Sequence, residues 1–264
     1  MTDFIDTFRP QRALKWIKKS STRQLRELVY LWGSIFGQRA FERFAIVGYA
    51  RTGSNFLAAG LDSSVSTRLH KEIFAAHNRE IGKDFEKILA KLYQKQPRSV
   101  KVVGFKLFYY HLTEEEWEKF LLHDDIQIIH LTRKNILRTI VSLDIAFKTD
   151  QWHTSFFKVK SVEKKTRLDA QHLLDRLEEI QVYEEITRAR FKDRGLLEIV
   201  YENLVRDPEG EFKRVEKYLG INDIDPNRIT LRKQNPEKLS VLIENYDEVS
   251  QALADTKYAY FLTD

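Results

Sequence analysis

The sequence contains no cysteine and no long uninterrupted apolar run. Without cysteine, the chain can form no disulfide framework, no thiolate metal site and no cysteine nucleophile. No stretch reaches the roughly 18 apolar residues that a membrane-spanning helix needs. The first residues, MTDFIDTFRPQRALKWIKK, carry early acids in place of the apolar core of a secretory signal. The chain as given is therefore expected to be cytoplasmic.

Length and charge set broad limits on the protein class. The 264 residues, of which 42% are hydrophobic and 31% charged, are sufficient for one large soluble domain with a real core. The net charge of +5 suits an anionic ligand. It is too small to indicate a nucleic acid partner, and none is expected.

A third absence lies in residues 44–61, FAIVGYARTGSNFLAAGL, which read as an apolar strand, a small-residue loop and a helix start. Gly48 and Gly53 have the spacing of the Walker glycines, but the lysine and hydroxyl residue that should follow Gly53 are missing. The cation lies inside the loop, as Arg51. Backbone N–H groups at a helix N-terminus still favour a phosphate. The segment therefore predicts a phosphate cradle for something other than magnesium-NTP.

Helical and strand patterns alternate along the chain, which predicts a single α/β domain with a central, mostly parallel sheet flanked by helices. Beyond the first strand, strands are expected at 65–70, 99–108, 126–131 and 196–200. Helices are expected at 83–95, 114–122, 136–147, 164–191, 209–219 and 240–249.

The N-terminal part of the chain differs from the rest. Residues 11–43 show apolar residues at helical spacing among basic ones. We therefore expect residues 1–43 to form a helical extension that precedes a domain of residues 44–264. The simpler interpretation packs these helices on the core. A basic, Trp-containing amphipathic segment also suits peripheral contact with a membrane surface.

A second motif lies in residues 126–146, IQIIHLTRKNILRTIVSLDIA. An apolar strand delivers Arg133 and Lys134 at its carboxyl end, and Ser142 falls one turn after Arg138 on the following helix. Open α/β folds bind ligands at this edge of the sheet. Arginine and serine there predict a second phosphate, separate from that of the first loop. Surface salt bridges are the alternative interpretation of these cations.

Both motifs match a known family. Residues 51–57, RTGSNFL, resemble the 5′-phosphosulfate loop of sulfotransferases that use 3′-phosphoadenylyl sulfate (PAPS), and residues 133–142 resemble their 3′-phosphate motif. The Arg-Thr-Gly-Ser form is similar to bacterial sulfotransferases acting on trehalose, lipooligosaccharides and related glycans. Further agreeing segments lie at residues 70–74, 103–107, 201–208 and 232–236.

The resemblance implies a P-loop-like fold and sulfuryl transfer from PAPS to an acceptor hydroxyl, on a carbohydrate or glycolipid, without a metal. The bisphosphate PAP would be the product. The implied nucleotide ligands are Arg51, Thr52, Gly53, Ser54, Asn55, Phe56, Arg133, Ser142, Arg232 and Lys233. In many family members the serine lies eight residues after the arginine. Here Ser142 lies nine after Arg133 and eight after Lys134, so either cation could hold the 3′-phosphate. The Arg-Lys-Asn order favours Arg133.

The resemblance also implies catalytic roles. Glu72 matches the glutamate that serves as base in bacterial members, with His70 as the alternative and His111 as a weaker candidate. Arg51 would stabilise charge on the leaving oxygen, and Lys106 would assist at the sulfuryl oxygens. Lys106 could equally be a strand-end cation without a catalytic role.

Two rival functions are considered. A P-loop kinase or NTPase requires the missing lysine and a Walker aspartate after an apolar strand. A non-enzymatic protein that binds nucleotides or other anions would rest on the basic balance alone. The oligomeric state and the acceptor's identity stay open.

Overall fold

The computed structural model describes residues 30, 33, 36–79, 84–152, 164–231 and 234–263. The predicted membrane contact of the basic N-terminal segment falls mainly on residues 1–29, outside this part, as do Arg232 and Lys233. Tyr30, Gly33 and Phe36 are helical. The first strand begins at Glu42, so the last two residues assigned to the helical extension belong to the sheet.

A five-stranded parallel sheet confirms the predicted fold class. Its strands are β1 (Glu42–Gly48), β2 (Thr67–His70), β3 (Val102–Phe108), β4 (Ile126–Thr132) and β5 (Leu197–Val200). They lie in the order β2-β3-β1-β4-β5, with every neighbouring pair parallel. The chain leaves β1 toward one edge of the sheet and leaves β4 toward the other. Such a reversal opens a crevice at the carboxyl ends of the two strands, where open α/β folds bind ligands.

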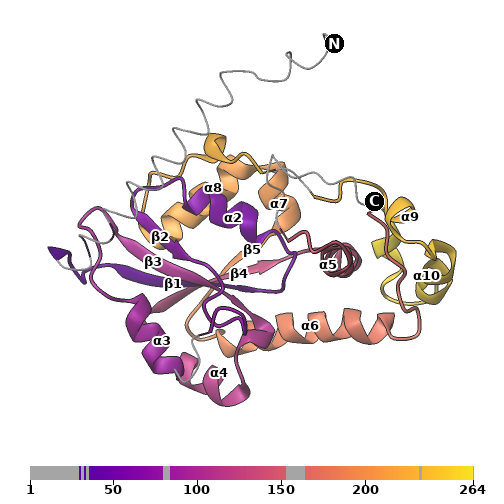
Figure 1. Cartoon of the computed structure of the whole chain (residues 1–264), viewed down its shortest axis with the longest axis horizontal. Coiled ribbons are helices and arrows are strands. Elements are labelled where there is room, and N and C mark those ends of the chain that lie inside the picture. Colours follow the sequence, from indigo (N-terminus) through magenta and orange to yellow (C-terminus); the bar gives the residue numbers. More distant parts are fainter. Residues whose placement is uncertain are drawn as a thin grey trace, which may run out of the picture.

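Helices cover both faces of the sheet (Figure 1). One face carries α2 (Ser54–Leu61), α7 (Tyr201–Arg206) and α8 (Pro208–Leu219), and the opposite face carries α3 (Phe85–Leu92), α4 (Glu114–Leu121) and α6 (Leu173–Arg190). To the right of the sheet in Figure 1 lie α5 (Ile136–Thr149), α9 (Leu239–Leu242) and α10 (Tyr246–Leu253). Short 3₁₀ turns occupy Tyr109–His111, Pro226–Arg228 and Ala259–Leu262. No helix among the described residues is long and apolar enough to cross a bilayer.

The alternation of side chains along β1 explains the two-sided packing. Phe44 and Ile46 enter the hydrophobic cluster shared with α2 and α8, whereas Ala45 and Val47 enter the cluster shared with α3 and α4. Because successive strand residues point to opposite faces, a continuous apolar strand fills both cores. A third cluster joins α5 and α6 to α9 and α10. The loops at the ends of β1 and β4 are thus held by packed helices.

Two predicted helices are wrong in extent. The one expected at 164–191 begins at Leu173, because the preceding segment runs beside the C-terminal part of the chain. There Leu168 donates its backbone N–H to Asn245 Oδ1 at 3.0 Å. The helix expected at 240–249 is divided into α9 and α10, with Asn245 in a non-helical conformation between them.

Candidate active site

Gly48 and Gly53, the two glycines with Walker spacing, each exclude a side chain for a different steric reason. A side chain at Gly48 would place its Cβ 2.5 Å from the carbonyl oxygen of Leu131 on β4. Gly53 has a φ of 95°, in the left-handed region, and its missing Cβ would lie 2.3 Å from the Tyr201 ring. Gly53 also precedes α2, which begins without a side-chain cap. The Phe56 N–H donates to the Gly53 carbonyl at 2.9 Å, so an anion at this end of α2 would meet the N–H groups that precede Phe56.

Arg51 is held at its backbone and at its side chain. Its φ of 67° is rare for a non-glycine residue, and its carbonyl accepts a hydrogen bond from Arg133 Nη1 at 3.2 Å. Its Nε donates to Ser142 Oγ at 3.0 Å and its Nη1 to the Trp152 carbonyl at 3.1 Å. Burial and the nearby charge of Arg133 lower the pKa of Arg51. A bound anion would offset both causes of this shift.

A cavity of about 260 Å³ lies where the two motifs meet. Its described lining contains three arginines and no carboxylate. One part is polar and the other is apolar. The polar lining comprises Arg51, Gly53, Ser54, Asn55, Arg133, Arg138, Ser142, Tyr201, Gln234 and Asn235; the apolar lining comprises Phe56, Val141, Val205, Leu231, Leu239 and Leu242. Positive charge beside apolar surface suits an anion attached to an apolar ring.

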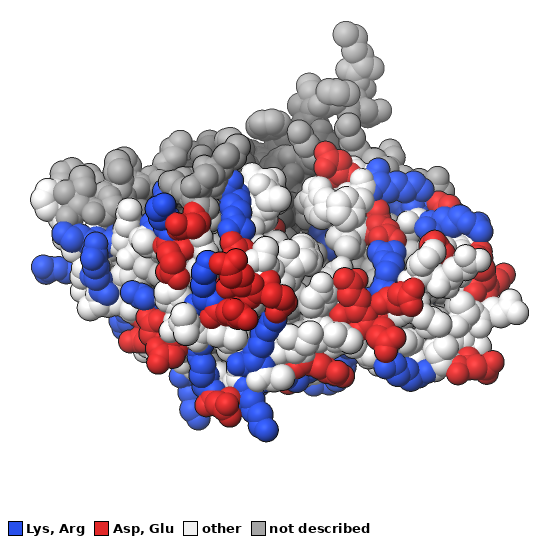
Figure 2. Space-filling view, turned by 90° about the horizontal axis from the view of Figure 1, so that it is seen from below, with Lys and Arg blue, Asp and Glu red and all other residues white. Residues whose placement is uncertain are grey.

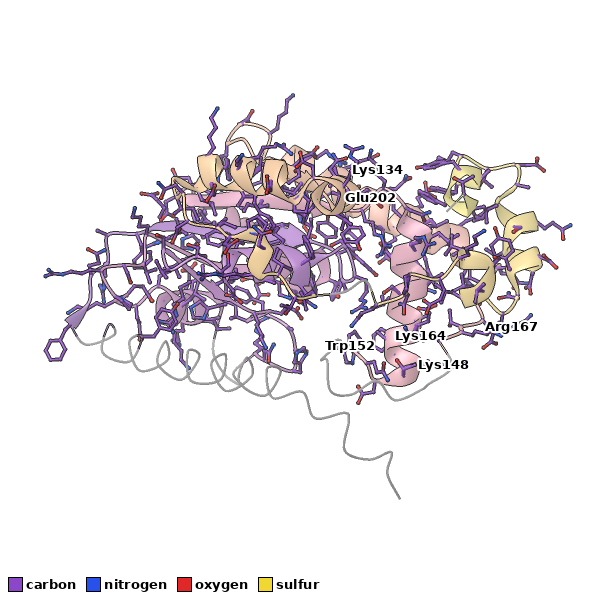
Figure 3. The ribbon with its side chains drawn as sticks, turned by 90° about the horizontal axis from the view of Figure 1, so that it is seen from above. Lys134, Lys148, Trp152, Lys164, Arg167 and Glu202 are labelled. Atoms are coloured by element: carbon purple, nitrogen blue, oxygen red, sulfur yellow. The ribbon has the colours of Figure 1, made fainter. Side chains whose placement is uncertain are left out.

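Arg133 faces the cavity and Lys134 does not. Arg133 is only 9% exposed, lies with its guanidinium 4.8 Å from the centre of the Tyr201 ring, and has its pKa lowered by burial. Lys134 is exposed. Figure 3 places it beside Glu202 at the beginning of α5. Glu202 approaches Arg133 to 3.9 Å but accepts the backbone N–H groups of Lys134 and Asn135 at 2.9 and 3.3 Å. Position favours Arg133 for a phosphate.

Helix α5 brings the second motif into contact with the first. Asn135 caps the helix by accepting the Arg138 N–H at 3.0 Å, which places Ser142 one turn further on the cavity side. Ser142 Oγ accepts from Arg51 and also lies 3.3 Å from Asn235 Nδ2. Arg51 of the first motif and Arg133 and Ser142 of the second, which were predicted to bind two separate phosphates, therefore line one cavity.

Lys106 and Glu72 form an ion pair next to this cavity. Lys106 on β3 is 3% exposed, and its Nζ lies 2.7 Å from Glu72 Oε1 and 2.9 Å from Asn55 Oδ1. Asn55 lines the cavity, so it connects the pair to the arginine cluster. Burial acts to raise the pKa of Glu72, but the charge and hydrogen bond of Lys106 outweigh it and leave the pKa below its usual value. Glu72 is thus an ionised carboxylate at neutral pH.

The two candidate histidines are neutral at pH 7. Burial, with the charge of Arg68, lowers the pKa of His70 to about 4, and no described residue makes a hydrogen bond with its Nε2. Burial likewise lowers the pKa of His111 to about 4. Its Nδ1 accepts the Phe108 backbone N–H at 3.1 Å, so that nitrogen is occupied. Of the three candidate bases, Glu72 is the one that contacts Lys106, which in turn contacts Asn55 of the cavity lining.

Thr52 and the late basic loop differ from the other predicted ligands. Thr52 is buried and does not line the cavity; its hydroxyl donates to the Tyr49 carbonyl at 2.7 Å and shapes the loop. Arg232 and Lys233 lie outside the described residues. Their described neighbours Leu231 and Gln234 line the cavity.

Three contributors to this site were not predicted as nucleotide ligands. Arg138 and Asn235 line the cavity, and Trp152 contributes a main-chain carbonyl. The spacing from Arg138 to Ser142 carried a signal, since residues four apart share a helix face. Asn235 lies in the segment 232–236 that resembles the family, but the resemblance gave it no role, and no sequence pattern marks a backbone carbonyl. Within the described part of the chain, no His, Asp and Glu side chains group in a way that could hold a metal ion.

Comparison with known proteins supports the family that the motifs predict. A family model described as the sulfotransferase family matches residues 118–226, which include Arg133, Ser142 and Tyr201 and begin after the Arg51 loop. The match agrees with the predicted sulfotransferase family over these residues, which are less than half of the chain. No curated protein matches the chain in sequence.

Three solved structures are similar at low identity. The sulfotransferase domain of the Synechococcus PCC 7002 olefin synthase is 16% identical, over 75% of this chain and 80% of that one, with a TM-score of 0.42. Mouse sulfotransferase SULT7A1 complexed with PAP is 17% identical, over 76% and 66%, with a TM-score of 0.43. A sulfotransferase from Alicyclobacillus acidocaldarius is 16% identical, over 84% and 96%, also at 0.43. These distant likenesses carry no residue assignment.

Proposed function

We propose that this chain, whose residues 118–226 are those of the sulfotransferase family, transfers a sulfuryl group from PAPS to an acceptor hydroxyl. The observation that carries the proposal is the cavity where Arg51 and Arg133 meet without a carboxylate in the described lining. Glu202 approaches Arg133 only to 3.9 Å, and buried cations without a close counter-charge destabilise a fold unless an anion joins them. A nucleotide with phosphates at both ends supplies such an anion.

The arrangement supports a division of the nucleotide over the cavity. The N–H groups at the start of α2, with Arg51, would bind the 5′-phosphate and neutralise charge that develops on its bridging oxygen. Arg133 and Ser142 would bind the 3′-phosphate. The Tyr201 ring and the apolar part of the lining would accommodate the adenine. Each role uses a side chain that the described lining contains.

Sulfuryl transfer from such a nucleotide needs one bond made and one broken. The acceptor oxygen forms a bond to sulfur as the bond from sulfur to the 5′-phosphate oxygen breaks, and the electron pair of that bond stays on the phosphate. Glu72 would accept the acceptor proton, while Lys106 would neutralise charge on the sulfuryl oxygens. The 2.7 Å contact between Glu72 Oε1 and Lys106 Nζ holds the proposed base next to the proposed cation. No step requires a metal ion.

The acceptor we propose is a carbohydrate or glycolipid hydroxyl, on the strength of the Arg-Thr-Gly-Ser motif. Beside the Lys106–Glu72 pair, the Phe108, Tyr110 and His111 rings form a continuous aromatic group, with centroid separations of 5.0 to 5.9 Å. Tyr110 is 49% exposed. Its ring is available to the apolar face of a sugar.

The rival functions have less support. Ser54 stands where a P-loop kinase needs its lysine, and Arg133 ends the strand where an NTPase would carry its aspartate. For nucleic acid, a one-signed surface is expected. On the face shown in Figure 2, Lys and Arg are intermixed with Asp and Glu. That face therefore offers no basic stripe.

Calorimetric titration tests the proposal. Adenosine 3′,5′-bisphosphate (PAP) should bind without magnesium, and Arg133→Ala should weaken it about 100-fold, because a buried charge-assisted contact to phosphate is lost. Arg51→Ala should weaken it similarly. ATP binding of equal strength that depends on magnesium would overturn the sulfotransferase interpretation in favour of an NTPase.

A further inference from the structure

Two hydrogen bonds to the protein orient the Arg51 guanidinium. Of its five N–H groups, Nε–H goes to Ser142 Oγ and one Nη1–H to the Trp152 carbonyl. No described residue accepts a hydrogen bond from Nη2. The Nε–H and Nη1–H groups point to different sides of the planar guanidinium, so these two contacts to α5 and the turn after it fix its plane and direction, and Nη2 is left to donate to an anion.

The Trp152 carbonyl is itself held in place. The Trp152 indole Nε1–H donates to Asp150 Oδ1 at 3.1 Å, and its ring meets the Phe147 ring edge-on with centroids 4.8 Å apart. Asp150 ends α5 with a φ of 51°, in the left-handed region, which turns the chain back toward the cavity. In Figure 3, Trp152 and Lys134 lie toward opposite ends of α5. The indole thus anchors a backbone acceptor.

We infer that Trp152 is a positioning residue for Arg51, and that its indole fixes the carbonyl that aims the guanidinium at the 5′-phosphate. This inference rests on the proposed function. The indole need not touch the nucleotide, because it acts through its own main chain and through Arg51. A long side chain that the protein has already oriented loses less freedom when its ligand binds, so the affinity is higher.

The inference predicts an effect confined to one end of the nucleotide. Adenosine 5′-monophosphate carries only the phosphate that Arg51 addresses, and adenosine 3′-monophosphate carries only the one assigned to Arg133. Trp152→Ala should weaken PAP and the 5′-monophosphate about tenfold, the scale of one hydrogen bond to a charged group, while the 3′-monophosphate changes by less than about twofold.

Two variants complete the experiment. Trp152→Phe keeps a ring against Phe147 but loses the donor to Asp150, so its affinities should fall between those of wild type and Trp152→Ala. Leu122→Ala changes an exposed residue after α4, 82% exposed, and should bind all three nucleotides as wild type does. Calorimetry gives the affinities, and thermal unfolding checks that each variant is folded.

The outcomes separate the inference from the proposed function. Wild-type protein that fails to bind PAP would overturn the proposed function. If wild type binds PAP but Trp152→Ala binds PAP and the 5′-monophosphate unchanged, the positioning role is wrong and the function stands. Equal losses for both monophosphates would also overturn it, since they indicate general damage to the cavity.

Discussion

Helix α5 adjoins charged side chains on two of its sides, and the charges on the two sides are compensated differently. Toward α6, Asp144 accepts two hydrogen bonds from Arg176, at 2.9 and 2.7 Å, and these raise the pKa of Arg176. Toward the cavity, Ser142 contacts Arg51, which is itself bonded to Arg133, and burial lowers the pKa of both arginines. Arg176 is paired with a carboxylate at hydrogen-bond distance, whereas Arg51 has no ion pair among the described residues and Arg133 meets Glu202 only at 3.9 Å.

The difference separates structural charge from charge kept for a ligand. A paired arginine is satisfied when the chain folds, so removing it should cost stability and leave ligand binding intact. An arginine without a closely paired carboxylate gains a full counter-charge only when an anion arrives, so removing it should cost binding. A second example of structural charge lies near His130 on β4. Glu198 pairs there with Arg188 of α6 and also approaches His130, which contacts the Tyr109 hydroxyl, so each charge has a partner within the fold.

The Lys106–Glu72 pair tests this distinction most sharply, because it is compensated yet adjoins the cavity. Glu72→Gln keeps the shape and can still accept from Lys106, but it cannot take a proton. If Glu72 is the base, turnover should fall about 10²- to 10⁴-fold while PAP affinity stays close to wild type. Sulfate transfer from radiolabelled PAPS to a panel of glycans gives the turnover, and calorimetry gives the affinity.

A matched control is a second partly buried ion pair, between Glu116 and Arg79. Lys106 contacts Asn55 of the cavity lining, whereas neither Glu116 nor Arg79 lines the cavity, so Glu116→Gln should affect stability and leave turnover unchanged. Unchanged turnover in Glu72→Gln would move the base role to His70 or His111 and place Glu72 with the structural pairs.

The fold was predictable where the physics is local. The apolar segments that became β1, β3 and β4 are buried strands that follow from composition alone, and their alternation with helices implies parallel pairing. The helix break at Asn245 was not predictable. Asn245 binds Leu168 across the fold, and such a long-range partner overrides a continuous helical pattern.

The site was predictable where a ligand is a side chain in a motif. The loop of Arg51 and the turn of Arg133 were each recognisable, because phosphate needs cations and N–H groups at strand ends. Their convergence on one cavity was not, since the contact between Arg51 and Ser142 spans 91 residues. The roles of the individual residues stay predictions until binding is measured.

The pH dependence of stability tests the region around His130, where the charges are compensated within the fold. His130 is fully buried, with its Nε2 2.7 Å from the Tyr109 hydroxyl, and burial lowers its pKa to about 4. Below about pH 6.5 His130 therefore binds a proton in the unfolded chain but not in the folded one. Its contribution to the free energy of unfolding is fully present above that pH and is lost as the pH falls toward 4. For His130 the loss between pH 7 and 5 is about 2 kcal/mol.

Urea unfolding at pH 7 and 5 measures this loss. His130→Gln should remove about 2 kcal/mol of the acid dependence. His172→Gln is the control, because Asp169 raises the pKa of that exposed histidine and its contribution has the opposite sign. An identical acid loss in wild type and His130→Gln would show that His130 is not buried as a neutral ring.

The smallest expected effect concerns Arg176. Arg176→Ala should lower the free energy of unfolding by about 1 kcal/mol, since the pair is partly solvent-exposed and a full buried-pair loss does not apply. PAP affinity should change by less than about twofold, in contrast to Arg133→Ala. A double-mutant cycle with Asp144→Ala isolates the pair energy. If Arg176→Ala weakened PAP as strongly as Arg133→Ala does, the presence of a carboxylate partner would not distinguish structural arginines from ligand-binding ones, because α5 would transmit either loss to the cavity.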